Sequence, residues 1–190
     1  MKSFIKSLPL SLFFLTLYLT SCSPGNSKSE EPVALYDYNV HEKIADLGLE
    51  LKEPSAPVAN YVHAVRTGNL VFMAGKGPRT PDGQLVVGKV GIDLTVEEGY
   101  QAARQVGVGQ LSALKAEIGD LNKVVRIVKV LGMVNSDSTF GNQPEVINGF
   151  SDLMVEVFGE RGKHARAAVG MASLPRNIAC EIEMIVEVQD

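Results

Sequence analysis

The strongest constraint on the fold of this 190-residue chain is an apolar, β-branched run, VVRIVKVLGMV, at residues 124–134. A run this apolar predicts a strand in the interior of a sheet. On either side of it lie segments with helical spacing, at residues 95–119 and 144–159. The first begins with a TVEE capping box, the second has Pro at its start, and both end at Gly. Two long helices around one buried strand predict a single α+β domain.

Further strands are expected on both sides of this unit. Residues 61–74 predict a hairpin whose Gly68-Asn69 pair supplies positive backbone dihedrals, and residues 85–90 predict a short third strand. The element order is therefore β-β(-β)-α-β-α-β-β, after a short helix within residues 34–47 and with the last two strands at residues 165–172 and 179–188.

The last strand alternates in a way that gives the sheet two unlike faces. Cys180, Ile182, Met184 and Val186 fall on one side, and Glu181, Glu183 and Glu187 fall on the other. Two helices can cover only one face, and apolar residues on neighbouring strands point to a partner on the other face. A homo-oligomer is the expected solution.

The N-terminal residues predict an exported lipoprotein. Residues 1–21 have a basic start, an apolar stretch too short to span a membrane, and then small residues. The LTSC sequence at residues 19–22 matches a lipobox, so we expect cleavage before Cys22 and a lipid on its thiol. Residues 22–33 then form a polar tether to a domain at residues 34–190. Ser23, rather than Asp, favours the outer membrane, with the domain on the periplasmic side. An ordinary signal peptide with a chance cysteine is the alternative.

Composition argues against several kinds of partner. The formal net charge is −4, with no basic stripe or aromatic platform of the kind that nucleic-acid binding uses, so we expect no nucleic-acid partner. His41, His63 and His164 are scattered and show no metal-ligand spacing. Cys22 and Cys180 are too few for a disulfide framework.

Three stretches in a fixed order resemble the Rid (YjgF-like) family of imine/enamine deaminases. AVRTGNLVF with AGKGP, at residues 64–78, is similar to that family's entry hairpin and glycine loop. VKVL at residues 128–131, followed by NGF at residues 148–150, resembles its central strand and second helix. HARAAVG at residues 164–170, followed by LP and EIE, resembles its C-terminal signature. Ala74 and Ala167-Ala168 replace more polar residues, which indicates a divergent branch with a different pocket.

The resemblance implies a chorismate-mutase-like fold with a mixed sheet, a homotrimer, and hydrolysis of imines or enamines of small 2-keto acids in clefts between subunits, with no cofactor. It assigns Arg166 to the substrate carboxylate, Gly75 to backbone contacts, Tyr61 and Asn148 to the cleft wall, and Glu181 to positioning the water. A guanidinium fork suits a carboxylate, and a carboxylate can orient water and shuttle a proton.

Other interpretations of the same residues stay open. Arg166 could form a structural ion pair with Glu181 or Glu183, Tyr61 could serve packing, and Asn148 could be an ordinary polar helix residue. The residue types favour a packing or surface role for His63 and His164 over that of a base, and a core position for Cys180. At the level of function, the alternative is a non-catalytic, membrane-tethered module that binds a small carboxylate at Arg166.

Overall fold

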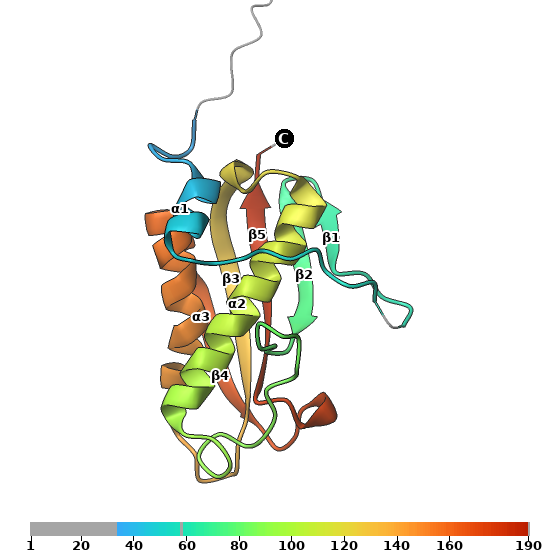
Figure 1. Ribbon diagram of the computed structural model, residues 1–190, viewed down its shortest axis with the longest axis vertical. Helices are drawn as coiled ribbons and strands as arrows, with labels where there is room; N and C mark the ends of the chain where they lie inside the picture. The colour runs from blue at the N-terminus through green and yellow to red at the C-terminus, as the bar shows by residue number, and fades with distance from the viewer. Residues whose placement is uncertain (1–33, 58, 190) are drawn as a thin grey trace, which may run out of the picture. The chain divides into compact units, whose positions relative to one another are not determined.

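The computed structural model describes residues 34–57 and 59–189, which belong to one compact unit that begins at Ala34 (Figure 1). The predicted signal peptide, the tether and Cys22 lie outside the described residues. Within the described residues, eight main elements follow one another: α1 (Val40–Asp46), β1 (Ala64–Thr67), β2 (Leu70–Lys76), α2 (Val96–Ile118), β3 (Val124–Asn135), α3 (Gln143–Phe158), β4 (Ala165–Met171) and β5 (Cys180–Val188). Three short 3-10 turns are η1 (Leu121–Lys123), η2 (Gly159–Gly162) and η3 (Pro175–Asn177).

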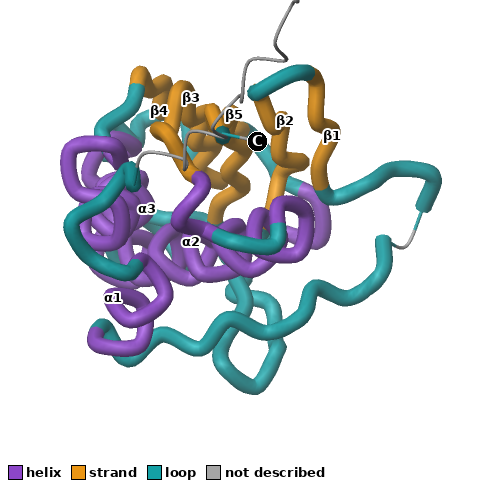
Figure 2. Tube along the Cα trace, turned by 90° about the horizontal axis from the view of Figure 1, so that it is seen from above, coloured by secondary structure: helices purple, strands orange, loops and turns teal. Residues whose placement is uncertain are grey.

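The strands form one mixed sheet in the order β1-β2-β5-β3-β4. β3 and β4 are parallel, and the other neighbouring pairs are antiparallel. The run predicted to be interior is β3, which has β5 on one side and β4 on the other. Seen from above, α2 and α3 lie together on one side of the sheet (Figure 2). The predicted α+β class, with a mixed sheet and two long helices on one face, is therefore confirmed.

The two long helices begin and end where the sequence indicated. Thr95 caps α2 through the backbone N–H of Glu98, whose side chain reaches back to complete the capping box. Gly119 ends α2 with a positive φ of 77°, and Pro144 lies in the first turn of α3. The helices touch closely at Gly149, because a Cβ atom there would collide with the carbonyl oxygen of Tyr100.

The predicted third strand is wrong. Residues 85–90 form only isolated bridges, such as Val87 with Ile178 and Val90 with Ser136. Gly88 and Gly91 explain this, because their φ values of 122° and 91° turn the backbone out of an extended ladder. The hairpin turn also differs in detail from the prediction. Gly68 alone has a positive φ, of 58°, which is the pattern of a type II′ turn.

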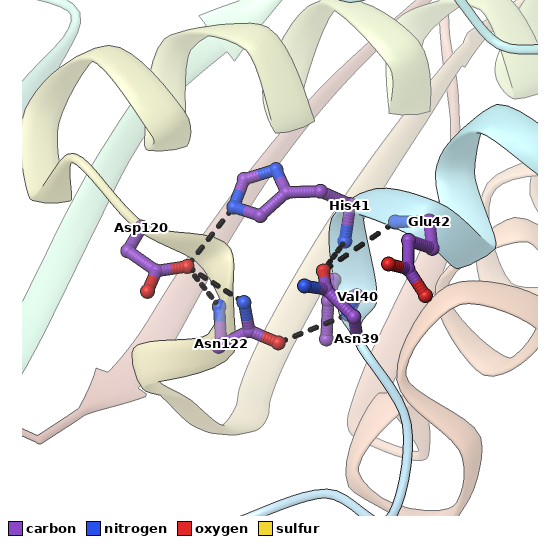
Figure 3. A network of polar contacts seen from close by, with 6 residues as sticks. All are labelled: Asn39, Val40, His41, Glu42, Asp120 and Asn122. Carbon is purple, nitrogen blue, oxygen red and sulfur yellow. Dashed lines mark hydrogen bonds and ion pairs between the residues drawn. The ribbon is translucent and has the colours of Figure 1, made fainter.

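α1 is held on the turn between α2 and β3 by a small polar network (Figure 3). Asn39 caps the helix by accepting from the backbone N–H of His41 at 2.8 Å. The His41 ring contacts the Asp120 carboxylate at 2.9 Å, and the backbone N–H of Val40 donates to Asn122 at 2.9 Å. α1 is seven residues long, too short to be stable by itself, so these contacts fix its place.

The two faces of the sheet are as unlike as the sequence predicted. On the helix face, the core residues of β5 and β3 are buried, among them Ile182, Met184, Val130 and Val134. On the other face, here called the open face, Val65 and Phe72 from β1 and β2 are 56% and 42% exposed. The domain thus satisfies one face of its sheet with its own helices and leaves apolar side chains on the other.

Candidate active site

Arg166 lies on β4, an edge strand, and its side chain reaches α3. One of its terminal nitrogens, Nη1, donates to Asn148 Oδ1 at 2.9 Å and to Ser151 Oγ at 3.0 Å. Asn148 and Ser151 are three residues apart on α3, so they share one face of that helix. Together with His164, described below, these residues are called the Arg166 cluster.

The remaining donors of Arg166 form a fork. Both protons of Nη1 are used by Asn148 and Ser151, which leaves Nε and Nη2 without a partner among the described residues. These two nitrogens point along one edge of a planar group and match the two oxygens of a carboxylate. Arg166 makes no ion pair with Glu181 or Glu183 in the described chain, so the structural ion-pair alternative is not what the structure shows.

His164 extends the cluster behind Ser151. Its Nδ1 lies 2.7 Å from the carbonyl oxygen of Gly162, which can only accept, so Nδ1 carries the proton. Its Nε2 is then free to accept the Ser151 hydroxyl at 3.1 Å. Burial lowers the pKa of His164, and the positive charge of Arg166 lowers it further, against the hydrogen bond to Gly162. A neutral imidazole is the form that this arrangement favours.

Glu181 and Gly75 are brought together on the open face. A Cβ atom at position 75 would collide with Glu181 Oε1, so the absence of a side chain there makes room for the carboxylate. Gly75 sits where the pairing of β2 with β5 shifts its register. Gln110 from α2 stabilises this irregularity, since its buried Nε2 donates to the carbonyl oxygens of Ala74 at 2.9 Å and Ile182 at 2.7 Å. Glu181 and Gly75 are called the Glu181 pair.

The charge state of Glu181 is perturbed by its surroundings. Burial raises the pKa of this carboxyl, and the negative charge of Glu183 raises it further.

Burial also lowers the pKa of Lys76, next to Gly75, and the Lys76 ammonium lies 3.2 Å from His63 Nδ1. Tyr61, two residues before His63, is 51% exposed. The register of β1 with β2 places Tyr61 at the same end of the sheet as Gly75.

Within one chain, the Arg166 cluster and the Glu181 pair lie on opposite faces of the sheet. Arg166 aligns with Val130 on β3, and Glu181 with Met133. The two residues are thus separated by two strand spacings, about 10 Å, and by a further three residues along β3. Arg166 turns toward α3, whereas Glu181 alternates with the buried Cys180 and Ile182 and faces away from the helices. One small substrate cannot contact both groups of the same chain.

Three residues near these groups were not predicted to have a role. Ser151 and His164 follow regular spacings, because Ser151 is one helical turn after Asn148 and His164 is two residues before Arg166. Those spacings could have identified them. No spacing in the sequence identifies Gln110. A polar residue in a helical pattern does not show that its side-chain amide will bind backbone carbonyls at the register shift between β2 and β5.

Other sequence predictions can be placed as well. Cys180 is fully buried, as expected of a core residue, and burial raises the pKa of its thiol to about 12. Over the part of the chain that the structure describes, no group of three His, Cys, Asp or Glu side chains could hold a metal ion. Among those same residues, no helix combines the length and hydrophobicity needed to cross a membrane.

Comparison with known sequences identifies relatives along most of the domain. Residues 41–188 match the family described as "YjgF/chorismate mutase-like, putative endoribonuclease". Protein TCP17 of Trypanosoma cruzi is 42% identical over 145 residues, which cover 76% of this chain and 91% of that protein. The mouse protein named 2-iminobutanoate/2-iminopropanoate deaminase is 33% identical, with 70% of this chain and 84% of that protein covered.

Solved structures show the same fold. A protein of unknown function from Agrobacterium tumefaciens superposes with a TM-score of 0.73 at 42% identity, over 79% of this chain and 94% of that one. A protein from Shewanella oneidensis superposes with a TM-score of 0.76 at 30% identity, over 80% of this chain and all of that one. The chain therefore belongs to the YjgF/chorismate mutase-like family, which includes the Rid proteins that its sequence resembles.

Proposed function

We propose that this protein hydrolyses imines or enamines of small 2-keto acids. The observation that carries the proposal is the fork formed by Nε and Nη2 of Arg166, whose other nitrogen is fixed by Asn148 and Ser151. An imine of a 2-keto acid carries a carboxylate next to its reacting carbon. A fork held in place on the protein binds that group in one orientation, which positions the C=N bond. The deaminase name of the mouse relative supports this substrate class.

The chemistry needs few groups beyond the Arg166 fork that binds the carboxylate. Water adds to the C=N carbon to give a carbinolamine, which then expels ammonia and leaves the keto acid. The protein must hold the water and move protons, and no cofactor takes part in these steps. Glu181 suits the first task, because its carboxylate oxygens can accept hydrogen bonds from a water molecule, and its raised pKa also makes it readier than usual to take up a proton. Gly75 leaves its backbone open beside that carboxyl.

We propose that the complete site forms between copies of the chain in a homotrimer. The Arg166 cluster and the Glu181 pair lie on opposite faces of one sheet, so a substrate held by the first can reach the second only on another copy. Apolar residues on the open face provide a surface for such an assembly, among them Val65, Phe72 and Val169, which are 56%, 42% and 40% exposed. Tyr61 would then line the cleft from the same side as Glu181.

A turnover assay tests the proposal. 2-Aminoacrylate or 2-iminobutyrate is generated enzymatically in the presence of the purified domain, and release of ammonia and keto acid is timed against spontaneous hydrolysis. We expect acceleration by the wild-type domain and by Arg104→Lys, which is the control for Arg166→Lys. Arg104 makes a bidentate pair with Glu156 between the two long helices, at 2.7 and 3.1 Å, and thus controls for the loss of a structural arginine. Absence of acceleration would contradict the proposal. A ligand-induced rise in Tm without turnover would support the carboxylate-binding module instead.

The family description also names endoribonuclease activity. The formal net charge of −4 does not favour binding of a polyanion. A labelled RNA included in the same turnover experiment distinguishes the two activities, and we expect cleavage no faster than in a buffer blank.

We further propose that Cys22 is lipidated and that the domain is held on the periplasmic side of the outer membrane. This rests on the LTSC sequence at residues 19–22. The folded domain begins close behind the tether, because Arg161 Nε donates to the carbonyl oxygen of Leu35 at 3.0 Å and the Tyr38 hydroxyl donates to that of Val157 at 2.9 Å. We expect Cys22→Ala to leave the membrane fraction or to stall in processing. Normal cleavage with unchanged membrane retention would contradict the anchor.

A further inference from the structure

The polar chain behind Arg166 is longer than carboxylate binding requires. Asn148 already fixes one proton of Nη1, yet the second is received by Ser151, whose own proton is directed to His164. The far side of the His164 ring is held by the Gly162 carbonyl at 2.7 Å. A hydroxyl, an imidazole and a group that orients the imidazole are the parts from which proteins build acid–base pairs.

We propose that Ser151 and His164 form a proton relay for the reaction at Arg166. Ser151 contacts the attacking water, and His164 is the base that stores its proton. This inference rests on the proposed function and deepens it, because it names the group that moves protons on the side of the cleft that binds the carboxylate. Glu181, reached from another copy, keeps the task of holding the water.

The proton balance closes over one turnover. Water forms a C–O bond to the iminium carbon and gives a proton to Ser151 Oγ, while the Ser151 hydroxyl proton passes to His164 Nε2. The carbinolamine nitrogen then takes this proton back through Ser151, and the C–N bond breaks to release ammonia. The carbinol proton returns by the same route to His164 and leaves with ammonia as ammonium. No oxidant or reductant is required.

The surroundings of His164 suit a base. Its ring is half-buried and meets the edge of the Phe150 ring, with centroids 6.4 Å apart. α3 presents the uncharged Phe150 and Ser151 to it, η2 presents the Gly162 carbonyl, and β4 presents the positive charge of Arg166. That charge disfavours a permanently protonated ring, and the bond to Gly162 keeps Nε2 aimed at Ser151. A proton therefore stays on His164 only transiently.

Paired variants with matched controls test the relay. Ser151→Ala removes the hydroxyl and His164→Asn removes the base, whereas Ser151→Thr keeps a hydroxyl. The controls are Ser112→Ala and His41→Asn. Ser112 is a helix serine that donates to the Val108 carbonyl, and His41 is a histidine that contacts Asp120, remote from Arg166. We expect Ser151→Ala and His164→Asn to lower kcat about 10²-fold with a smaller change in KM. Ser151→Thr should recover most of the rate, and both controls should match wild type.

The pH profile separates a relay from a structural role. A neutral His164 is needed for the first step, so the wild-type rate should fall in acid, below the usual histidine range because its pKa is lowered. His164→Asn should lose this acid limb, and the control His41→Asn should keep it. The relay would be overturned if wild type turns over substrate and both Ser151→Ala and His164→Asn keep its kcat and its acid limb. The proposed function would still stand in that case. Absence of wild-type turnover would instead remove the proposed function.

A measurement on the unmodified protein covers variants that fail to fold. Nitrogen-15 NMR of the His164 ring at neutral pH should show a proton on Nδ1 and none on Nε2. A ring protonated on Nε2, which could not accept the Ser151 hydroxyl, would overturn the relay whatever the variants do.

Discussion

The helix face and the open face of the sheet are made from the same strands but have different tasks. On β5, Cys180, Ile182, Met184, Val186 and Val188 are at most 2% exposed beneath α2 and α3. The residues between them are Glu181, Glu183, Ile185 and Glu187, which leave the covered core and include three carboxylates. On β5 the helix face is therefore apolar throughout, whereas the open face places acidic and apolar side chains side by side.

Stability and chemistry reside in different parts of the domain. The helix face contains the fully buried side chains, such as Phe150 and Leu153, and its contacts hold the domain together. The open face holds Glu181 with a raised pKa, and the edge beside α3 holds Arg166, whose Nε and Nη2 have no partner among the described residues. The contacts that stabilise the domain thus lie within one chain, whereas we propose that the active site is completed by a neighbouring copy.

Truncation on the helix face should have the largest effect. Phe150→Ala removes a fully buried ring of α3 that packs beside Gly107 of α2, so we expect a loss of about 3–5 kcal/mol in the free energy of unfolding. Urea denaturation followed by circular dichroism measures it. A loss below about 1 kcal/mol would show that this face does not dominate stability.

A charge on the open face should act on assembly instead. Phe72 aligns with Val65 on β1 and Ile185 on β5, in the middle of an apolar row. We expect Phe72→Glu to weaken association by about 2 kcal/mol or more, since buried aromatic anchors dominate interfaces. Light scattering at micromolar concentration should then report monomers for the variant and trimers for wild type, with an unchanged circular dichroism spectrum. A wild-type monomer would contradict the assembly, and an unfolded variant would contradict the division between the faces.

Arg166 tests the chemistry of the edge beside α3. Arg166→Lys keeps the charge but loses the fork, so we expect substrate affinity or turnover to fall by about 1.5–3 kcal/mol, or roughly one to two decades. Arg166→Ala should fall further, and both variants should remain folded trimers. Steady-state kinetics beside light scattering measures both properties. Unfolding or dissociation of Arg166→Ala would favour a structural role for the arginine.

Glu181→Gln should give the smallest change in stability, with a defined pH dependence. Because the pKa of Glu181 is raised on folding, its protonated form is favoured in the folded state. The stability it contributes is present below its usual pKa of 4.5 and is lost as pH rises through the raised value. Glutamine cannot ionise, so the variant should have a slightly higher Tm than wild type at pH 7 and a similar Tm near pH 4. A lower Tm at pH 7 would mean that the carboxylate makes a stabilising contact.

Local rules were sufficient for most of the fold. The capping box at Thr95 and the glycines that end both helices depend on neighbouring residues alone, and they were predicted correctly. Alternation in β5 correctly separated the two faces. The strand expected at residues 85–90 failed, because the apolar spacing there did not reveal the backbone conformations of Gly88 and Gly91.

The site was harder to predict because its geometry depends on long-range packing. The resemblance placed Arg166 and Asn148 in one cleft, and they do touch, at 2.9 Å. The resemblance did not indicate that hydrogen bonds extend from Arg166 to Ser151 and His164, since it assigned neither residue a role in the site. The proximity of Gly75 and Glu181 depends on an irregularity between β2 and β5 that Gln110 stabilises, and no local pattern encodes it. Lipidation of Cys22 stays a prediction.

Mixed trimers test directly whether one active site combines Arg166 of one copy with Glu181 of another. Arg166→Ala and Glu181→Gln chains with different tags are produced together, and trimers that carry both tags are purified. Each variant alone should be nearly inactive. A trimer that contains both kinds of chain has both natural residues in one of its three clefts, whichever chain is in excess, so we expect about a third of wild-type turnover. Mixed trimers no more active than their parents would contradict a site shared between copies.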